Sequence, residues 1–341
     1  MWKQCHYRRL FAFFAFLAGA APLIMTWGRA LGRSQPERCH SNESGRSTET
    51  QPAYYKQASS MIHTLRLWLI IIYLSPWGSA SSAADGCYHV FLDAGANVGM
   101  HTRFLFEPKK YPRATYPRDV FDPWFGRERD PRTTCSFGFE PNPAHQHHHE
   151  DLQRFLAATG RRYAFFMVGL GATVSDITFY RNNAISGGSR HHSWGFGTTC
   201  RDGRCHDNVS VPVIDFAAWI EKEVVGRSIP AGPATVRPRV ILKMDIETAE
   251  FSLIPRMIAN DTFCRSIDYA TIEWHPHMTP MEVHTGGGTT TLDSHIEALA
   301  VQHALEAVID ARSREVNCHT NFTHGDFDDE SYSMGGRARH P

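Results

Sequence analysis

The chain has 341 residues, and its 35 Lys and Arg are balanced by 35 Asp and Glu, so the formal net charge is zero. This balance argues against a general nucleic-acid binder, which needs a surplus of cations. Apolar residues make up 42% and aromatic residues 12% of the chain, which is enough for a hydrophobic core and excludes a largely disordered protein.

The first part of the chain, residues 1–84, has the pattern of a targeting region. Basic residues precede an apolar segment at 10–27, which predicts a signal anchor or a signal peptide. The polar stretch at 33–60 lacks hydrophobic periodicity and predicts a disordered stalk. A second signal-like segment at 61–83 ends in small residues typical of a cleavage site, so Met61 is an alternative start.

From either start, we expect the rest of the chain to enter the secretory pathway. It would then be secreted, or lie in the lumen of the ER or Golgi as a single-pass membrane protein held only by its N-terminal segment. Six of the eight cysteines lie beyond residue 60, and an even number favours disulfides there. Cys200 and Cys205 bracket a short turn, for which a local disulfide is the first interpretation and a zinc site the second. The N-glycosylation sequons are at Asn42, Asn208, Asn260 and Asn321.

Beyond residue 84, short apolar runs alternate with helical segments, and we predict one α/β domain over 85–323 followed by a flexible tail at 324–341. The alternation favours a Rossmann-like, doubly wound and mostly parallel sheet with helices on both faces. The predicted strands are 88–93, 135–141, 163–171, 176–180 (at an edge), 210–215, 239–245, 268–275 and 304–309. The predicted helices are 101–106, 143–159, 216–225, 249–258 and 293–303.

Two long insertions, at 106–134 and 181–208, interrupt this order. The first is rich in aromatic residues, and we expect it to be either a cover for a substrate or a surface excursion. A histidine-rich stretch begins the helix after residue 142, and a solvated polar face is the favoured interpretation over a metal site. Its histidines are His145, His147, His148 and His149.

The sharpest motif is the turn D-A-G-A-N-V-G at 93–99, directly after a predicted strand and before a helix. In a doubly wound sheet, ligands bind at such corners beyond the carboxyl ends of the strands. We expect Gly95 to let the backbone approach a ligand, and Gly99 to let the helix pack against the strand. Asp93 places a negative charge at the strand end. Glu140 ends the next strand, where an acidic residue can bind two ribose hydroxyls.

These features together favour a nucleoside-binding sheet. The dinucleotide fingerprint G-x-G-x-x-G is not met because Asn97 stands in place of its second glycine, which makes a nicotinamide oxidoreductase a distant alternative. The sequence also lacks the P-loop motif G-x-x-x-x-G-K-[ST]. A cleft lined by carboxylates suits a positively charged sulfonium cofactor better than it suits ATP.

Three segments, VFLDAGANVG, FGFEPNP and LKMDIETAE, resemble the FkbM-type S-adenosylmethionine-dependent methyltransferases, which carry D-x-G-A-N-x-G and D-x-E-G-A-E. The resemblance covers about 90–309 and implies a class I methyltransferase-like fold with S-adenosylmethionine as cofactor. Thr248 departs from the family pattern because it stands where the family has Gly. The candidate cofactor-binding residues are Asp93, Gly95, Asn97, Gly99, Glu140 and Asp245.

Acidic residues and a histidine are predicted to meet at the same edge of the sheet. Asp245, Glu247 and Glu250 follow one predicted strand, and Glu273 and His275 end the next. A methyl-accepting hydroxyl benefits from a base, for which His275 is favoured, and Asp245 and Glu273 complete the candidate catalytic set. Glu247 and Glu250 are candidates for binding substrate or, with His275, a divalent metal ion. Their alternative role is to stabilise the N-terminus of the next helix.

The function that the sequence predicts is an S-adenosylmethionine-dependent O-methyltransferase. Its acceptor would be a glycan or another small hydroxylated molecule of the secretory pathway. The alternative is a non-catalytic secreted or surface module that keeps the methyltransferase fold and binds a carbohydrate or a protein, and the Thr248 departure leaves room for it.

Overall fold

The computed structural model describes residues 81–181, 196–197, 208–232, 235–285 and 288–324. Residues 1–80 of the predicted targeting region, the Cys200–Cys205 turn and the predicted tail beyond His324 lie outside these residues. The end of the predicted targeting region belongs to the domain, because Ala84 is fully buried in the core and the backbone N–H of Ala83 donates to the carboxylate of Glu223. Among the helices in the described part of the chain, none has both the length and the apolar character that a membrane span requires.

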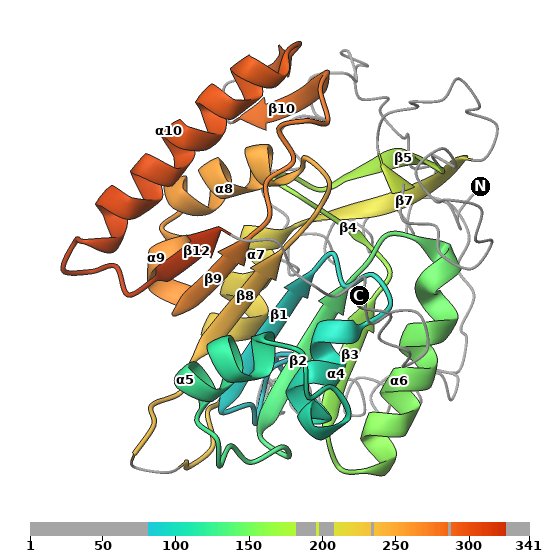
Figure 1. Ribbon diagram of the computed structural model, residues 1–341, viewed down its shortest axis with the longest axis vertical. Coiled ribbons are helices and arrows are strands. Elements are labelled where there is room, and N and C mark those ends of the chain that lie inside the picture. Colours follow the sequence, from blue (N-terminus) through green and yellow to red (C-terminus); the bar gives the residue numbers. More distant parts are fainter. Residues whose placement is uncertain (1–80, 182–195, 198–207, 233–234, 286–287, 325–341) are drawn as a thin grey trace, which may run out of the picture. The chain divides into compact units, whose positions relative to one another are not determined.

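A six-stranded sheet forms the centre of the domain, and every neighbouring pair of its strands is parallel (Figure 1). The first strand lies in the middle of the sheet. The next two strands are added on one side of it, and the later strands are added on its other side. The switch point of this doubly wound order therefore lies between β1 and β8. The strands in spatial order are β12 (Asn321–His324), β9 (Tyr269–Ile272), β8 (Val240–Met244), β1 (His89–Ala94), β2 (Thr134–Phe139) and β3 (Arg162–Phe166).

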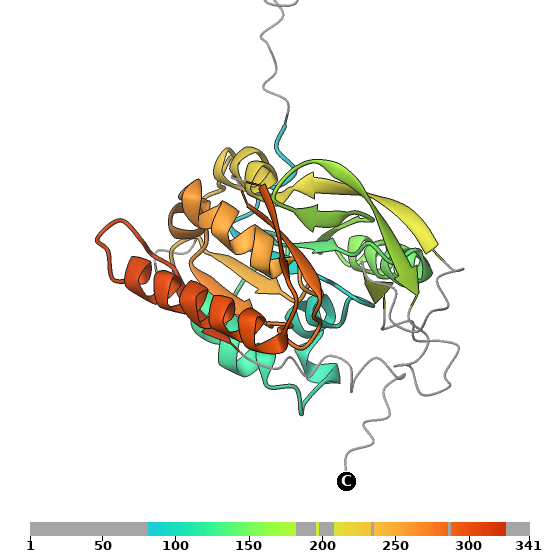
Figure 2. The same ribbon diagram turned by 90° about the horizontal axis from the view of Figure 1, so that it is seen from above.

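Helices cover both faces of this sheet, and the side chains of β1 show why (Figure 2). Successive residues of a strand point to opposite faces. Val90 and Leu92 are buried against α7, α8 and α9, whereas Phe91 is buried against α4, α5 and α6. The predicted α/β class with a mostly parallel sheet is thus confirmed. The helices are α4 (Met100–Phe106), α5 (Asp122–Phe125), α6 (Gln146–Ala158), α7 (Phe216–Ile220), α8 (Glu250–Ala259), α9 (Thr262–Ser266) and α10 (His295–Ser313), with the shorter turns η1 (Pro108–Lys110), η2 (Pro117–Phe121), η3 (Pro143–His145) and η4 (Glu221–Val225).

Two smaller sheets flank the carboxyl end of the central one. The larger has the order β4 (Gly169–Gly171), β7 (Asn208–Asp215), β5 (Ser175–Arg181) and β6 (Phe196–Gly197). The other is the antiparallel pair β10 (Met281–Thr285) and β11 (Gly288–Leu292). The predicted strand at 163–171 is therefore two strands in two sheets. A Cβ on Gly169 or Gly171 would lie 2.9 or 2.7 Å from Val213, so these glycines let β7 pack close to β4.

The predicted strand at 304–309 is wrong, because this segment is part of α10. Ser294 begins that helix with a capping box to Glu297, which fixes the start of a helical register. Val301, Leu305 and Ile309 then contact the core at a spacing of four residues. A helical rather than an alternating pattern thus buries the apolar side chains of this segment.

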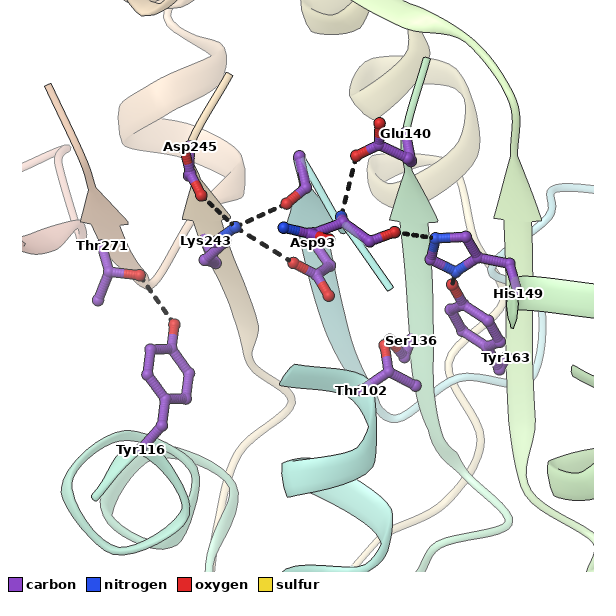
Figure 3. Close-up of polar contacts among 12 residues, drawn as sticks. Asp93, Thr102, Tyr116, Ser136, Glu140, His149, Tyr163, Lys243, Asp245 and Thr271 are labelled. Carbon is purple, nitrogen blue, oxygen red and sulfur yellow. Dashed lines mark hydrogen bonds and ion pairs between the residues drawn. The ribbon is translucent and has the colours of Figure 1, made fainter. Parts of the chain in front are cut away.

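The first insertion, 106–134, is part of the core and neither a substrate cover nor a surface excursion. Phe121 and Phe125 are buried against Phe91 of β1, and the rings of Phe91 and Phe121 are 5.0 Å apart. The hydroxyl of Tyr116 is 2.8 Å from that of Thr271 on β9 (Figure 3). The insertion thus supplies part of the apolar layer that covers this face of the sheet, together with α4 and α6.

Within the residues that the structure describes, two disulfides join distant segments of the domain. Cys87 pairs with Cys135, and Cys264 pairs with Cys318. These pairs fit an oxidising compartment, as expected for a secretory-pathway protein.

Candidate functional site

A pocket of about 850 Å³ lies at the switch point of the central sheet. The turn after β1 and the residues that follow β2, β8 and β9 form one wall, and residues of β4, β5, β7 and β10 form the other. The predicted site residues on this pocket are Gly95, Asn97, Glu140, Asp245, Glu247, Glu273 and His275. Segments far apart in the sequence therefore meet around one cavity.

Gly95 is required by a close approach between two strands. Its φ angle is +78°, and a Cβ at this position would lie 1.6 Å from the carbonyl oxygen of Asp245. The backbone N–H of Asp245 donates to the carbonyl of Ala94, which holds the two chain segments together. The backbone that follows β8 thus occupies the space of a side chain at Gly95. Gly95 also lines the pocket, and the approach of its backbone to a ligand stays a prediction.

Gly99 lets α6 pack close to the turn after β1. We expected it instead to let α4, the helix that it precedes, pack against a strand. A Cβ here would lie 2.8 Å from Leu152 of α6, and φ is +79°. Gly99 is not among the described residues that line the pocket, so its predicted contact with the cofactor is not supported.

Asp93 lies below the pocket and not on its wall. It is fully buried and faces Lys243 of β8, with 3.9 Å between its Oδ1 and the lysine Nζ. The same Nζ donates to the carbonyl oxygen of Gly95 at 2.7 Å and to Oδ2 of Asp245 at 3.0 Å (Figure 3). The prediction that Asp93 contacts the cofactor is therefore corrected: with Lys243, it supports the turn from beneath.

Lys243 was missed by the sequence reasoning, although a signal was present. The strand V-I-L-K-M is apolar except for this lysine, and both faces of the strand are buried. A lysine is almost never fully buried unless it is paired. Its position thus indicates a buried partner of opposite charge at the switch point.

Glu140 keeps its predicted place on the pocket wall. Its two carboxylate oxygens accept hydrogen bonds from the backbone N–H groups of Asn97 and Asn142, both at 2.9 Å. An ionised carboxylate has about four lone-pair sites, so these two bonds leave capacity for ligand hydroxyls. The side chain is 10% exposed, and the contacts hold it in one orientation.

The histidine-rich stretch is not uniformly solvated, because His145 and His149 are buried. Nε2 of His149 lies 2.7 Å from the carbonyl oxygen of Asn97, and Nδ1 lies 2.7 Å from the hydroxyl of Tyr163 (Figure 3). A carbonyl only accepts, so Nε2 carries the proton and Nδ1 accepts from the tyrosine. His149 thereby ties α6 to the turn that carries Asn97, whose φ is +48°.

Acid is expected to destabilise the fold through this histidine. Burial lowers the pKa of His149 to about 4, so the unfolded chain binds a proton at a higher pH than the folded one. The neutral ring contributes at most about 3 kcal/mol to the free energy of unfolding. This contribution is complete above a pH of about 6.5 and is lost as the pH falls towards 4. Urea unfolding at pH 7.5 and 4.5 measures the loss of stability on acidification. This loss should be smaller for His149→Gln than for the wild type. Equal losses in the two proteins would contradict this account.

His275 is held by a buried carboxylate. Oε1 of Glu250 accepts from the backbone N–H of His275 at 2.8 Å and lies 3.1 Å from its Nδ1. Nε2 faces the pocket, 3.5 Å from Asp245 and 3.7 Å from Glu273. Glu250 is fully buried and is not among the described residues on the pocket wall, so it positions His275 and is not a candidate for binding substrate or metal.

The charge of the His275 ring follows from these neighbours. Burial alone would lower its pKa, but the hydrogen bond and charge of Glu250, with the charges of Glu247 and Asp245, outweigh burial and raise the pKa to about 9. The ring is therefore protonated at neutral pH. To act as the predicted base, it must first lose this proton.

The turn between β8 and α8 contains two residues in the left-handed region of backbone conformation. Glu247 and Thr248 both have positive φ angles, of 52° and 87°. This conformation is favourable for glycine and costly for a β-branched residue. The departure at Thr248 thus places strain in a turn that also presents Glu247 to the pocket.

Replacing Thr248 with Gly should stabilise the fold modestly. Glycine relieves the backbone strain of the folded state but also raises the conformational entropy of the unfolded chain. The first effect on the free energy of unfolding is the larger, and we expect a net gain of about 0.5–1 kcal/mol. Asn97→Gly is the matched control, because asparagine tolerates a positive φ better and should gain less. Urea unfolding of both variants measures the difference, and a loss of stability in Thr248→Gly would refute the strain.

Comparison with known proteins gave no match: no family model matches the chain, and neither a curated protein nor a solved structure matches it.

Proposed function

We propose that this protein is an S-adenosylmethionine-dependent methyltransferase that methylates a hydroxyl of a glycan or of another small hydroxylated acceptor. The observation that carries the proposal is the meeting of the Gly95 turn, Glu140 and Asp245 around one pocket at the switch point. This is where a doubly wound sheet binds nucleoside ligands. The resemblance of three segments to the FkbM-type methyltransferases supports the same class.

The residues present fit such a cofactor. The carboxylate of Glu140, already oriented by two backbone N–H groups, has acceptor capacity for the two ribose hydroxyls. The carboxylates of Asp245 and Glu273 place negative charge on the wall, which favours a cation. The volume of about 850 Å³ is at the large end of the range for small-molecule sites, as expected of a site that holds a cofactor and an acceptor together.

The bound cofactor would supply a methyl group on a positively charged sulfur. The acceptor oxygen would form the new bond to the methyl carbon as the carbon–sulfur bond breaks, and the demethylated cofactor would leave as a neutral thioether. The proton of the acceptor hydroxyl would pass to the cluster of Asp245, Glu273 and His275. Positioning such a base is worth about 10²–10⁴ in rate. Glu250 contributes by fixing the ring of His275, so that Nε2 faces the carboxylates of the pocket wall.

Methyl transfer is tested by incubating the full chain with methyl-labelled S-adenosylmethionine and a panel of glycans, glycolipids and small hydroxylated molecules. We expect label in one class of acceptor, on oxygen. Cofactor binding without any labelled product would favour the alternative of a non-catalytic binding module, and the strained turn at Thr248 is the observation that keeps this alternative open.

The role of Glu140 gives a second test. Glu140→Ala removes charge-assisted hydrogen bonds worth about 1.5–3 kcal/mol, so we expect affinity for S-adenosylmethionine to fall about 10- to 100-fold. Glu282→Ala is the control, since this exposed carboxylate lies on the opposite wall of the pocket and should change the affinity less than about twofold. Calorimetric titration of both variants, with their unfolding midpoints, separates lost contacts from lost folding. Equal affinities in the two variants would exclude Glu140 from the cofactor site.

A further inference from the structure

One wall of the pocket brings together the side chains that bind divalent metal ions. Asp245 and Glu247 follow β8, and His275 follows β9, so two neighbouring parallel strands deliver them to the same edge. One ligand atom from each of the three lies within 4.8 Å of the other two. Two ligands on opposite sides of a metal ion, with bonds of about 2.1–2.5 Å, are about 4.2–5 Å apart. The three atoms are therefore close enough together to reach one metal ion with small movements of the side chains.

The orientation of His275 is a separate observation that points to a metal. A histidine ligand usually donates its second ring N–H to a carboxylate or carbonyl, which fixes the free nitrogen as the ligand atom. Here the fully buried Glu250 lies 3.1 Å from Nδ1, and Nε2 faces the pocket. The His275 side chain is only 5% exposed, so its ring is held in this position from behind.

Carboxylates surround Nε2 of His275, and a metal ion bound to this nitrogen would take the place of its proton. Asp245 and Glu273 lie 3.5 and 3.7 Å from this nitrogen, and Glu247 lies on the same wall. The neighbouring lysine, Lys243, directs its Nζ to Oδ2 of Asp245 and to the backbone of Gly95. Oδ1 of Asp245 faces Nε2 of His275, on the other side of the carboxylate from the lysine contact.

We propose that Asp245, Glu247 and Nε2 of His275 bind one divalent metal ion of the Mn²⁺ type on the wall of this pocket. Carboxylate oxygens suit Mg²⁺ and Mn²⁺, and the added imidazole favours a first-row transition ion over Mg²⁺. Glu273 lies within reach as a further ligand, and the open side of the site faces the cavity. A metal ion there would bind the oxygen of an acceptor hydroxyl and lower its pKa. Only this catalytic use rests on the proposed methyl transfer; metal binding does not.

The test is a titration of the metal-free full chain with Mn²⁺ alone, followed by electron paramagnetic resonance and calorimetry. We expect one site and a hyperfine coupling from one imidazole nitrogen. His275→Gln should abolish that coupling, and Asp245→Asn or Glu247→Gln should weaken Mn²⁺ binding at least tenfold. Glu247 is half-buried in a turn, so its variant should fold even if the others do not.

Two further variants separate this site from general attraction of cations. Glu250→Gln should weaken Mn²⁺ about 10- to 100-fold through loss of the ring's orientation, although Glu250 is not a ligand. Asp176→Asn removes an exposed carboxylate from the opposite wall and should leave Mn²⁺ affinity unchanged.

The results also distinguish this inference from the proposed function. Mn²⁺ binding with the expected nitrogen coupling, but without any binding of S-adenosylmethionine, would support the metal site and count against methyl transfer. Binding of S-adenosylmethionine with no Mn²⁺ site, or with Mn²⁺ affinity that Asp245→Asn and Glu247→Gln leave unchanged, would overturn the metal site alone.

Discussion

Replacing Gly95 with Ala is expected to destabilise the fold by about 3–5 kcal/mol or to prevent folding. The added Cβ would lie 1.6 Å from the carbonyl oxygen of Asp245, so the turn after β1 and the segment after β8 would have to separate. Alanine at a φ of +78° adds strain of its own. Because both segments form the pocket, any folded protein that remains should bind neither cofactor nor metal normally. Urea unfolding of the full chain measures the loss.

Gly160→Ala is the matched control for this prediction. Gly160 has a φ of +71°, but a Cβ there would have no atom within 4 Å. The free energy of unfolding of this variant should fall by only about 1 kcal/mol, which is the cost of placing alanine at a positive φ angle. A similar cost at the two positions would mean that the close approach at Gly95 contributes nothing.

Lys243→Met is the second substitution with a large expected effect. The methionine preserves most of the volume but removes the positive charge that pairs with the buried Asp93 and with the partly buried Asp245. Removing one partner of a buried ion pair costs about 3–5 kcal/mol, because a carboxylate is left uncompensated in the interior. The loss of the bond to Gly95 O should also loosen the turn. We expect a lower unfolding midpoint and weaker cofactor binding.

Lys222→Met tests whether this effect depends on burial. Lys222 also pairs with a carboxylate, Glu223, at 2.6 Å, but its side chain is 75% exposed. Exposed ion pairs contribute about 0–1 kcal/mol, so this variant should unfold close to the wild type. Comparable losses for the two lysines would contradict the role assigned to Lys243.

The sequence predicted the elements that depend on local pattern. The strand at 88–93, the turn after it and the helix that follows are close to β1, Gly95–Gly99 and α4. Burial on both faces makes the centre of β1, residues 90–92, apolar, and the glycines mark the turn. The edge position of Glu140, Asp245 and His275 also followed from the sequence, since the carboxyl ends of parallel strands share one edge.

The sequence did not predict contacts that depend on how segments pack. Glu250 was predicted either to bind substrate or a metal ion or to stabilise the N-terminus of the helix. Its bond to His275 arises only because α8 lies against the segment after β9. Gly99 was assigned to the ligand, but α6 occupies its open side. The aromatic insertion was taken for a loop because its side chains reach the core through irregular turns and not through one periodic helix.

The account depends most on the claim that the pocket between β1, β2 and β8 binds a nucleoside cofactor with a positively charged sulfur. Calorimetric titration of the purified full chain with S-adenosylmethionine tests it directly. We predict one site per chain, competition by the demethylated product, and much weaker binding by Glu140→Ala. The absence of both heat and a thermal shift, in a chain shown to be folded by its unfolding transition, would contradict the claim.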